Sequence, residues 1–289
     1  MIVITGASGH LGRHVFEQLS RLVDPAQLVA GVRTPEKVTD LAAQGVNVRR
    51  LDYTQLDTIR AAVDGADQVL LISSSEVGQR TQQHRAVIEA AVDAGVAHLV
   101  YTSILRADTS PLLLAEEHRA TEAAIRASGL TATILRNGWY IENYTEHLAP
   151  ALDHGTIVGS AQNGRIAAAT RADFAQAAVA VLTNDSLRGR TFELAGTAFT
   201  MTELASTVSD VIGRTITYSD LPPSAYQDLL IANGVPPAFA EILVDADLGV
   251  AGGHLDAPPT DLEQLIGRTS TPHHDAIVAA LSPAATTLS

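Results

Sequence analysis

Short apolar runs alternate with helix-length segments over the first 137 residues, and this alternation is what most constrains the fold. The apolar runs are Ile2–Thr5, Leu28–Arg33, Val46–Asp52, Gln68–Ser74, His98–Ser103 and Thr131–Asn137. Helices are predicted between them at residues 11–22, 35–44, 54–64, 79–94 and 113–128. Glycines follow several of these stretches where helices commonly end, at Gly45, Gly65, Gly95 and Gly129. Apolar strands separated by single helices predict an α/β protein with a doubly wound parallel sheet, which binds ligands at the carboxyl ends of its strands.

The pattern changes after about residue 143. Strand-like pieces are predicted at Arg165–Ala169, Thr191–Leu194 and Thr215–Ser219, and helices at 172–182, 202–212, 224–233, 237–246 and 260–266. We therefore expect two domains, residues 1–143 and 144–289, the second a smaller α+β portion on the substrate side of the sheet. Residues 165–182 are expected to pack back onto the first domain, and the last eight residues to be frayed. Asp245 and Asp247 are expected on the exposed face of a helix end.

A glycine-rich turn follows the first predicted strand. Its residues are Gly6, Ala7, Ser8, Gly9, His10, Leu11 and Gly12, with a glycine at every third position. Glycines allow a tight turn and a close approach of the backbone, and the N-terminus of the next helix offers free N–H groups to a pyrophosphate. Strand, glycine turn and helix in this order predict a Rossmann-type loop that binds a dinucleotide. The alternative is a turn with a purely structural role.

The end of the second predicted strand selects between NAD and NADP. An acidic residue there would accept the ribose 2′-hydroxyl of NAD, but the chain has Arg33, 21 residues after Gly12. A guanidinium suits a 2′-phosphate by its charge and its forked donors, and Arg13 and Lys37 are expected to add to the same pocket. NADPH is therefore predicted over NADH. The alternative is that Arg33 is a solvated charge at a strand end.

Three hydroxyl side chains close the fourth predicted strand. Ser73, Ser74 and Ser75 are candidates for contacts with the adenosine ribose or the pyrophosphate. For each serine the alternative is ordinary turn chemistry at the end of a strand.

Charge and composition exclude several classes of protein. The chain has 19 basic and 32 acidic residues, a formal net charge of −13 and no basic run longer than Arg49–Arg50, so nucleic acid is not an expected partner. It has no cysteine, which excludes disulfides, thiolate nucleophiles and Cys-ligated metals. His273 and His274 are expected to form a surface pair rather than a metal site, because no further ligand cluster supports them.

No part of the sequence predicts a membrane or secretory protein. There is no segment of about 18 apolar residues, and Ile2–Thr5 is too short and uncharged to begin a signal peptide. A cytoplasmic location is the default expectation. The oligomeric state is not readable, and a homodimer is one option.

Lys37 is the only lysine, since the other basic residues are arginines. Many short-chain reductases use a Tyr-x-x-x-Lys pair, in which the tyrosine donates a proton and the lysine lowers its pKa. At the matching spacing this chain has His118 and Glu122, and Tyr101 is followed by no lysine, so the pair cannot form. His118 and Glu122 are expected on a solvated helix face.

A reductase without that pair can still reduce a quinone. The acceptor is electrophilic and its hydroquinone anion takes a proton from water, so the protein supplies mainly orientation, stacking and a hydrogen bond to the developing oxyanion. Candidate donors are Asn143, Tyr140 and His118. Aromatic residues are scarce, yet Trp139, Tyr140 and Tyr144 fall within six residues and would provide a wall for a planar substrate. Packing of Trp139 in the core is the alternative.

Several stretches together resemble the NmrA-like atypical short-chain reductases, and most closely the bacterial type 2 NAD(P)H:quinone oxidoreductases. The matching stretches are 4–12, 32–33, 70–80, 101–103, 107–111, 135–140 and 169–173. The resemblance runs nearly end to end and implies reduction of quinones by NADPH without flavin or metal. It implies cofactor contacts at residues 6–12, Arg33, residues 73–75, Asn137, Gly138, Trp139, Tyr140, Ile141, Glu142 and Arg171. It also implies a substrate-side, catalytic role for Asn143, with Tyr140 beside it.

Two other functions remain open from the sequence. One is a redox-sensing regulator that binds NADP(H) without turnover, as NmrA-like proteins can do. The other is a reductase of a different conjugated carbonyl compound.

Overall fold

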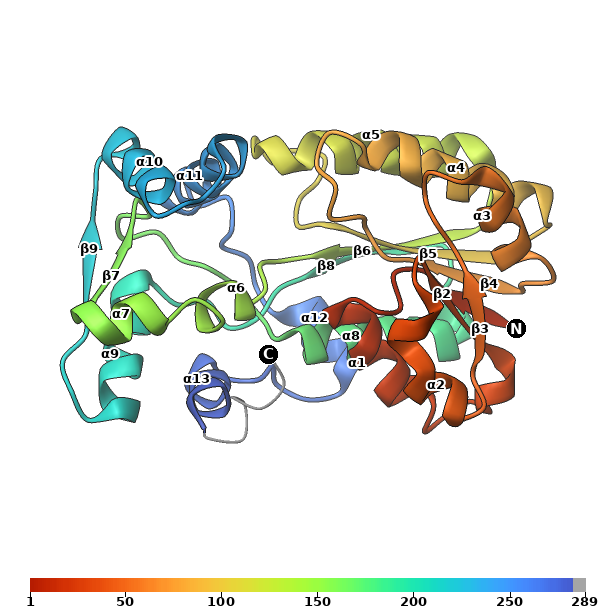
Figure 1. Ribbon diagram of the computed structural model, residues 1–289, viewed down its shortest axis with the longest axis horizontal. Coiled ribbons are helices and arrows are strands. Elements are labelled where there is room, and N and C mark those ends of the chain that lie inside the picture. The colour runs from red at the N-terminus through yellow and green to blue at the C-terminus, as the bar shows by residue number, and fades with distance from the viewer. Residues whose placement is uncertain (283–289) are drawn as a thin grey trace. The chain divides into compact units, whose positions relative to one another are not determined.

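The computed structural model describes residues 1–282, which form two compact units (Figure 1). Unit 1 comprises Met1–Asp108, Leu114–Asn137 and Arg171–Glu193. Unit 2 comprises Thr109–Leu113, Gly138–Thr170 and the chain from Leu194 onward. The predicted frayed end lies, from residue 283 on, outside the described residues.

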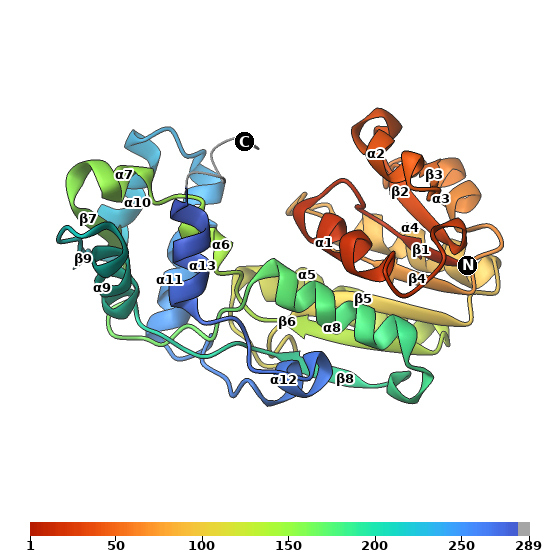
Figure 2. The same ribbon diagram turned by 90° about the horizontal axis from the view of Figure 1, so that it is seen from below.

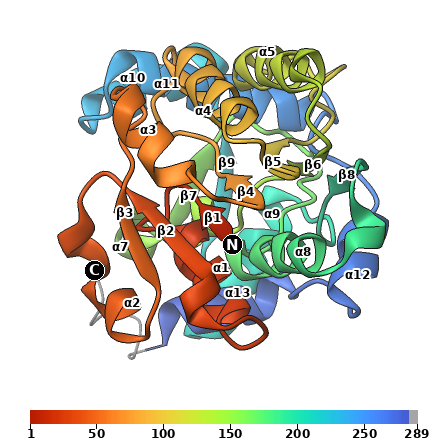
Figure 3. The same ribbon diagram turned by 90° about the vertical axis from the view of Figure 1, so that its right-hand side faces the viewer.

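A seven-stranded sheet forms the centre of unit 1 (Figure 3). Its strands are β1 (Ile2–Ile4), β2 (Leu28–Val32), β3 (Asn47–Arg50), β4 (Gln68–Leu71), β5 (His98–Ile104), β6 (Ala132–Asn137) and β8 (Thr191–Leu194). Their order is β3-β2-β1-β4-β5-β6-β8, and the pairs from β3 to β6 are parallel. The chain starts in the middle, with Ile2 paired to Leu28 on one side and to Gln68 on the other. This confirms the predicted doubly wound, Rossmann-type α/β sheet.

Helices cover both faces of this sheet (Figures 2 and 3). One face carries α3 (Leu56–Val63), α4 (Arg80–Asp93) and α5 (Leu113–Ser128), and the other carries α1 (His10–Leu19) and α8 (Arg171–Thr183), which pack against each other. The shorter elements are η1 (Pro25–Gln27), η2 (Pro35–Val38), α2 (Thr39–Ala43) and η3 (Asp185–Leu187). Because the strands are covered on both sides, β1, β2 and β5 are buried throughout, as continuous apolar runs predict.

The predicted helix stops of unit 1 are confirmed. Each of the four glycines has a left-handed φ, namely +91° at Gly45, +71° at Gly65, +68° at Gly95 and +76° at Gly129. Glycine adopts this conformation without the steric cost that a Cβ brings, which is why these positions end helices.

Unit 2 is mainly helical. Its elements are α6 (Glu142–Thr145), α7 (Ala149–His154), β7 (Thr156–Gly159), α9 (Met201–Ile212), β9 (Thr217–Asp220), α10 (Pro223–Ala232), α11 (Pro237–Ala251), α12 (Thr260–Ile266) and α13 (His273–Leu281). Strands β7 and β9 pair in parallel. A capping box starts α9, in which the Glu203 N–H donates to Thr200 Oγ1 at 3.1 Å and the Thr200 N–H donates back to Glu203 Oε2 at 2.7 Å.

One predicted strand of this half is wrong. Residues 165–169 form no strand, because only single bridges pair them, Ile166 with Phe199 and Ala169 with Tyr140. The segments α6, α7, β7 and α13 were not predicted at all.

Within the described part of the chain, no helix combines the length and the hydrophobicity that a bilayer span requires.

Candidate functional site

The glycine turn after β1 is closed too tightly for a side chain. Gly6 has a φ of +60°, and the Gly9 N–H donates to the Gly6 carbonyl oxygen at 2.9 Å. A Cβ added at Gly12 would lie 2.5 Å from that oxygen and 2.9 Å from Ala7 Cα. Helix α1 therefore packs directly against the turn, so its N-terminus lies close to any ligand that the turn binds.

The N-terminus of α1 has donors to offer. Gly9 is the N-cap and provides no side-chain acceptor, and the first turn has no acidic residue. The first N–H groups of an α-helix, here from His10, Leu11 and Gly12, have no acceptor within the helix. Ser8, Gly9 and His10 are exposed. A pyrophosphate fits this place, because the N–H groups and the helix dipole both favour negative charge.

Two basic side chains follow β2, and a third reaches the same segment from α1. Arg33 is exposed, and its Nη1 lies 3.2 Å from Glu76 Oε1. Arg13 donates through Nη2 to the Lys37 carbonyl oxygen, and its Nη1 lies 2.5 Å from Asp40 Oδ2. This guanidinium holds the pKa of Asp40 below its usual value. Since exposed ion pairs are worth about 1 kcal/mol or less, a phosphate can displace Glu76 from Arg33 at small cost.

The three serines after β4 have different surroundings. The Ser73 N–H donates to Thr102 Oγ1 at 2.9 Å, and the Ser73 Oγ is buried without a hydrogen bond to any described residue. Ser74 is buried, and its N–H donates to His84 Nε2 at 3.0 Å. Ser75 is exposed. Of the three serines, Ser73 is therefore the one whose buried hydroxyl needs a ligand as its hydrogen-bond partner.

A second buried oxygen of this kind ends β6. Asn137 is 4% exposed, and within the described residues its Oδ1 accepts no hydrogen bond. Its main-chain oxygen accepts from the Leu105 N–H at 2.9 Å, so the backbone is held while the side-chain oxygen stays open. Leaving a buried acceptor unpaired costs about 1–3 kcal/mol, which is recovered if a ligand supplies the donor.

These positions share one edge of the sheet. The glycine turn, Arg33, Ser73 and Asn137 follow the carboxyl ends of the parallel strands β1, β2, β4 and β6. Arg171, half-buried, begins α8 in the same unit. The carboxyl edge beside the reversal of strand order is where doubly wound sheets bind nucleotides. The closed glycine turn and the two open oxygens therefore fit a dinucleotide.

The remaining predicted site residues belong to unit 2: Gly138, Trp139, Tyr140, Ile141, Glu142 and Asn143. The Gly138 N–H donates to the Leu194 oxygen at 2.7 Å, and a Cβ at Gly138 would lie 2.9 Å from that oxygen. Trp139, Tyr140 and Asn143 are half-buried. Their roles toward cofactor and substrate remain predictions.

The prediction that His118 and Glu122 lie on a solvated face is wrong. They are 7% and 2% exposed, because this face of α5 packs on the sheet. His118 Nδ1 shares a hydrogen bond with the Tyr101 hydroxyl at 2.7 Å. Burial lowers the pKa of His118 to about 3 and raises the pKa of Tyr101. His118 is therefore neutral at pH 7 and poorly suited to supply a proton.

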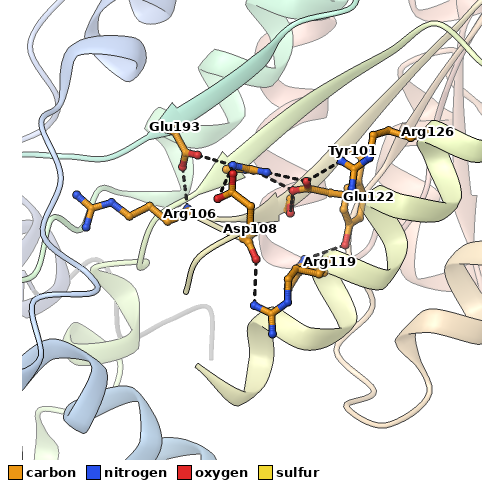
Figure 4. Close-up of polar contacts among 11 residues, drawn as sticks. Tyr101, Arg106, Asp108, Arg119, Glu122, Arg126 and Glu193 are labelled. Carbon is orange, nitrogen blue, oxygen red and sulfur yellow. Dashed lines mark hydrogen bonds and ion pairs between the residues drawn. The ribbon is translucent and has the colours of Figure 1, made fainter. Parts of the chain in front are cut away.

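Glu122 belongs to a buried ion cluster that sequence reasoning missed (Figure 4). Arg136 binds it with two donors, Nε to Oε1 at 3.0 Å and Nη2 to Oε2 at 2.8 Å. The Ser103 hydroxyl donates to the same Oε1 at 2.7 Å. Arg136 Nη1 also lies 2.7 Å from Glu193 and 3.1 Å from Asp108. An arginine as the one charged residue of a predicted interior strand was the available signal, because buried charges require partners.

In residues 1–282, no three His, Cys, Asp or Glu side chains are grouped so that they could hold a metal ion. His274 is exposed beside Asp275, as a surface pair predicts. His273 is half-buried instead, because its ring packs on Phe199 with centroids 4.9 Å apart and its Nε2 contacts Thr207 Oγ1 at 3.0 Å.

The chain is similar to known proteins over most of its length. Residues 6–185 match the family described as NAD(P)H-binding. Quinone oxidoreductase 2 of Escherichia coli strain K12 is 47% identical over 272 residues, which cover 94% of this chain and 95% of that protein. The crystal structure of the E. coli NADPH-dependent quinone oxidoreductase QOR2 complexed with NADPH has a TM-score of 0.95 and 45% identity, covering 98% of this chain and all of that one. An NmrA-like family domain-containing oxidoreductase of Aspergillus flavus, flvB, is 30% identical over 95% of this chain and 93% of its own length.

Proposed function

Because the chain belongs to the NAD(P)H-binding family and to its NmrA-like members, we propose that it reduces quinones to hydroquinones with NADPH. The reaction is a direct hydride transfer that uses no flavin and no metal. The likeness to quinone oxidoreductase 2 over nearly the whole of both chains carries the proposal. The polar groups at the carboxyl edge of unit 1 support the proposal, because NADPH carries a polar or charged group that each of them can bind.

When bound, NADPH supplies the hydride from its nicotinamide ring. The N–H groups at the start of α1 hold the pyrophosphate, and the absence of a side chain at Gly12 lets the backbone approach it. Arg33, with Arg13 and Lys37, binds the 2′-phosphate. The open Ser73 hydroxyl and the Asn137 side-chain oxygen bind further polar groups of the same cofactor.

The acid–base chemistry of unit 1 fits a quinone acceptor. Tyr101 has no lysine to lower its pKa, and its hydroxyl is already shared with a neutral His118. A quinone does not need a strong acid, because its reduced anion is stabilised by the ring. Sugar epimerases and alcohol dehydrogenases that depend on the Tyr–Lys pair are therefore disfavoured.

The direct test mixes the purified protein with NADPH and 1,4-benzoquinone and follows the loss of NADPH absorbance. Oxidation clearly above the uncatalysed background is expected, without added flavin or metal. Tight NADP binding with no turnover would instead support the redox-sensing regulator. Faster reduction of a different conjugated carbonyl than of any quinone would support the third function.

A Gly12→Ala variant is expected to bind NADPH at least about tenfold more weakly. The added methyl group would meet Gly6 O at 2.5 Å, so the turn must open and its N–H groups move away from the pyrophosphate. Fluorescence titration with NADPH measures the affinity, and the melting temperature shows whether the chain still folds. An unchanged affinity in a folded variant would contradict a cofactor role for the turn.

Asn143→Ala is expected to lower kcat by about 100- to 1,000-fold, the loss seen when a hydrogen bond to a developing oxyanion is removed. The KM for NADPH should stay the same, since the proposed contact is with the acceptor. Tyr140→Phe tests the second proposed donor in the same way. Asn233→Ala, an exposed position of the same unit, is the control. Full activity of Asn143→Ala would contradict a catalytic role for this residue and leave it only a structural place at the start of α6.

The proposed partner is thus a small-molecule quinone. We also propose a cytoplasmic location, because NADPH is regenerated in the cytoplasm, where the reaction would consume it.

A further inference from the structure

A buried histidine in unit 1 holds the segment that follows β4. His84 on α4 is fully buried, and its Nε2 accepts from the Ser74 N–H at 3.0 Å. A main-chain N–H can only donate, so Nε2 carries no proton and the neutral ring has its proton on Nδ1. Nδ1 lies 2.9 Å from Thr121 Oγ1 of α5, whose hydroxyl donates to the Glu117 carbonyl oxygen at 2.8 Å. The bonds therefore run in one direction, from Ser74 through His84 to the backbone of α5.

This arrangement fits only the neutral imidazole. Protonation of His84 would place an Nε2–H against the Ser74 N–H, so that two donors would face each other. Burial lowers the pKa of His84 to about 3, and the positive charge of Arg80 acts in the same direction. The ring also packs edge-on against Tyr53 and Tyr101, with centroids 6.4 and 5.4 Å away. His84 is therefore a fixed acceptor at neutral pH.

Ser74 has a partner at each of its three polar groups. Its N–H donates to His84, its carbonyl oxygen accepts from Arg80 Nε at 2.5 Å, and its Oγ accepts from the Glu76 N–H at 3.2 Å. Arg80 and His84 are four residues apart and so lie on the same face of α4. One helix face thus holds both sides of this residue, which is a fixed point in the irregular segment 72–79.

The neighbours of Ser74 are the residues that this segment contributes to the candidate cofactor site. Ser73 precedes it and carries the buried Oγ that has no hydrogen bond to any described residue. Glu76 follows two residues later and pairs with Arg33 at 3.2 Å. Any movement of the Ser74 backbone therefore displaces the open hydroxyl on one side and the partner of Arg33 on the other.

We propose that His84 is a positioning residue for NADPH, which holds the Ser73 hydroxyl in place by accepting the Ser74 N–H. The inference rests on the cofactor part of the proposed function, in which Ser73 binds a polar group of NADPH. His84 is 0% exposed, so it acts through Ser74 and not by contact with the cofactor. Without this acceptor the Ser74 N–H would be buried and unpaired, a costly state that the segment relieves by moving.

Equilibrium binding of NADPH to the full chain, followed by its fluorescence and without a quinone, tests this role. His84→Leu keeps an apolar side chain of similar size but removes the acceptor, and it should weaken NADPH about tenfold. His84→Gln can place its amide oxygen where Nε2 lies, so it should bind NADPH within about threefold of the parent chain. Rescue by glutamine is expected only if the acceptor itself is what matters.

His98 provides the matched control. It is also fully buried in unit 1, and both of its ring nitrogens are bonded, Nδ1 to Gln68 at 3.0 Å and Nε2 to Thr133 at 2.8 Å. His98 begins β5, however, so it lies at the amino edge of the sheet, opposite the candidate site. His98→Leu should lower the melting temperature about as much as His84→Leu does, and should leave the affinity for NADPH unchanged.

A double variant tests the route through Ser73. Ser73→Ala alone should weaken NADPH about fivefold, the usual contribution of one hydrogen bond. In the Ser73→Ala chain, His84→Leu should weaken NADPH by less than about threefold further, because the hydroxyl that it positions is already gone. If His84→Leu does not fold, Thr121→Val removes the group that accepts from Nδ1, and it should weaken NADPH about threefold.

The proposal is overturned if folded His84→Leu or Thr121→Val binds NADPH as the parent does, if His98→Leu weakens it as much as His84→Leu, or if the losses add fully in the double variant. Because the assay contains no quinone, the expected pattern without NADPH oxidation by benzoquinone would refute the proposed function alone. Turnover with unchanged NADPH binding in His84→Leu would refute the positioning role alone. A parent chain that does not bind NADPH would refute both.

Discussion

Replacing Arg136 by methionine is expected to lower the free energy of unfolding by about 3 to 5 kcal/mol, the usual cost of removing one partner of a buried ion pair. The reason is that Glu122 is only 3% exposed at its side chain and receives two of its hydrogen bonds from Arg136. Without the guanidinium the carboxylate keeps the Ser103 hydroxyl as a buried donor, and its charge is left poorly compensated. Urea unfolding followed by circular dichroism measures the loss.

Two further variants make this prediction specific. Arg126 also contacts Glu122, at 3.4 Å, but is 67% exposed, so Arg126→Met should cost less than about 1 kcal/mol. Combining Arg136→Met with Glu122→Leu removes both buried charges and should recover much of the loss. If Arg136→Met costs no more than Arg126→Met, the cluster is not the stabilising element that its geometry indicates.

The second large effect is expected at the end of β2. Arg33→Ala should raise the KM for NADPH by about 10- to 100-fold, the range for losing a charge-assisted contact with phosphate, and should change the KM for NADH little. NADH lacks the 2′-phosphate, so the guanidinium has nothing to neutralise in it. Initial rates with each cofactor at a saturating quinone concentration give both KM values.

Arg21→Ala is the matched control for Arg33→Ala. Arg21 is as exposed as Arg33, at 69%, and also pairs with a glutamate, Glu17 on α1. It should leave both KM values unchanged. Glu76→Gln frees Arg33 from its carboxylate partner and should lower the KM for NADPH slightly. Equal increases for NADPH and NADH in Arg33→Ala would contradict binding of the 2′-phosphate.

The sheet of unit 1 could be predicted because its signals are local. Buried parallel strands are continuous apolar runs, and the helices between them end at glycines such as Gly65 and Gly129 that need a left-handed φ. The glycine turn could be read for the same reason, since strand, turn and helix follow one another directly. The longer helices of unit 2, α9 to α12, could be predicted in the same way, but its shorter elements lack such signals. Its strand β7 is four residues long and its helix α6 is also four, too short for a periodic pattern.

Polar residues in the interior were the main source of error. His118, Glu122 and Asp247 look solvated in the sequence, because charged and polar residues usually are. Each is instead drawn inward by a partner distant in the chain: Tyr101, Arg136 and the Ser160 N–H. Such pairings depend on the tertiary fold, so no window of neighbouring residues contains them.

The position of Lys37 also has a practical consequence. It is the only side-chain amine in the chain, it is exposed, and Arg13 holds its main-chain oxygen. An amine-directed fluorophore will therefore attach at a single known side chain, next to the proposed 2′-phosphate pocket. The labelled protein would report cofactor occupancy as a change in emission, with no engineered cysteine needed. The same compositional bias that removes the usual catalytic lysine leaves this protein with one natural side-chain attachment point, in addition to the α-amino group of Met1.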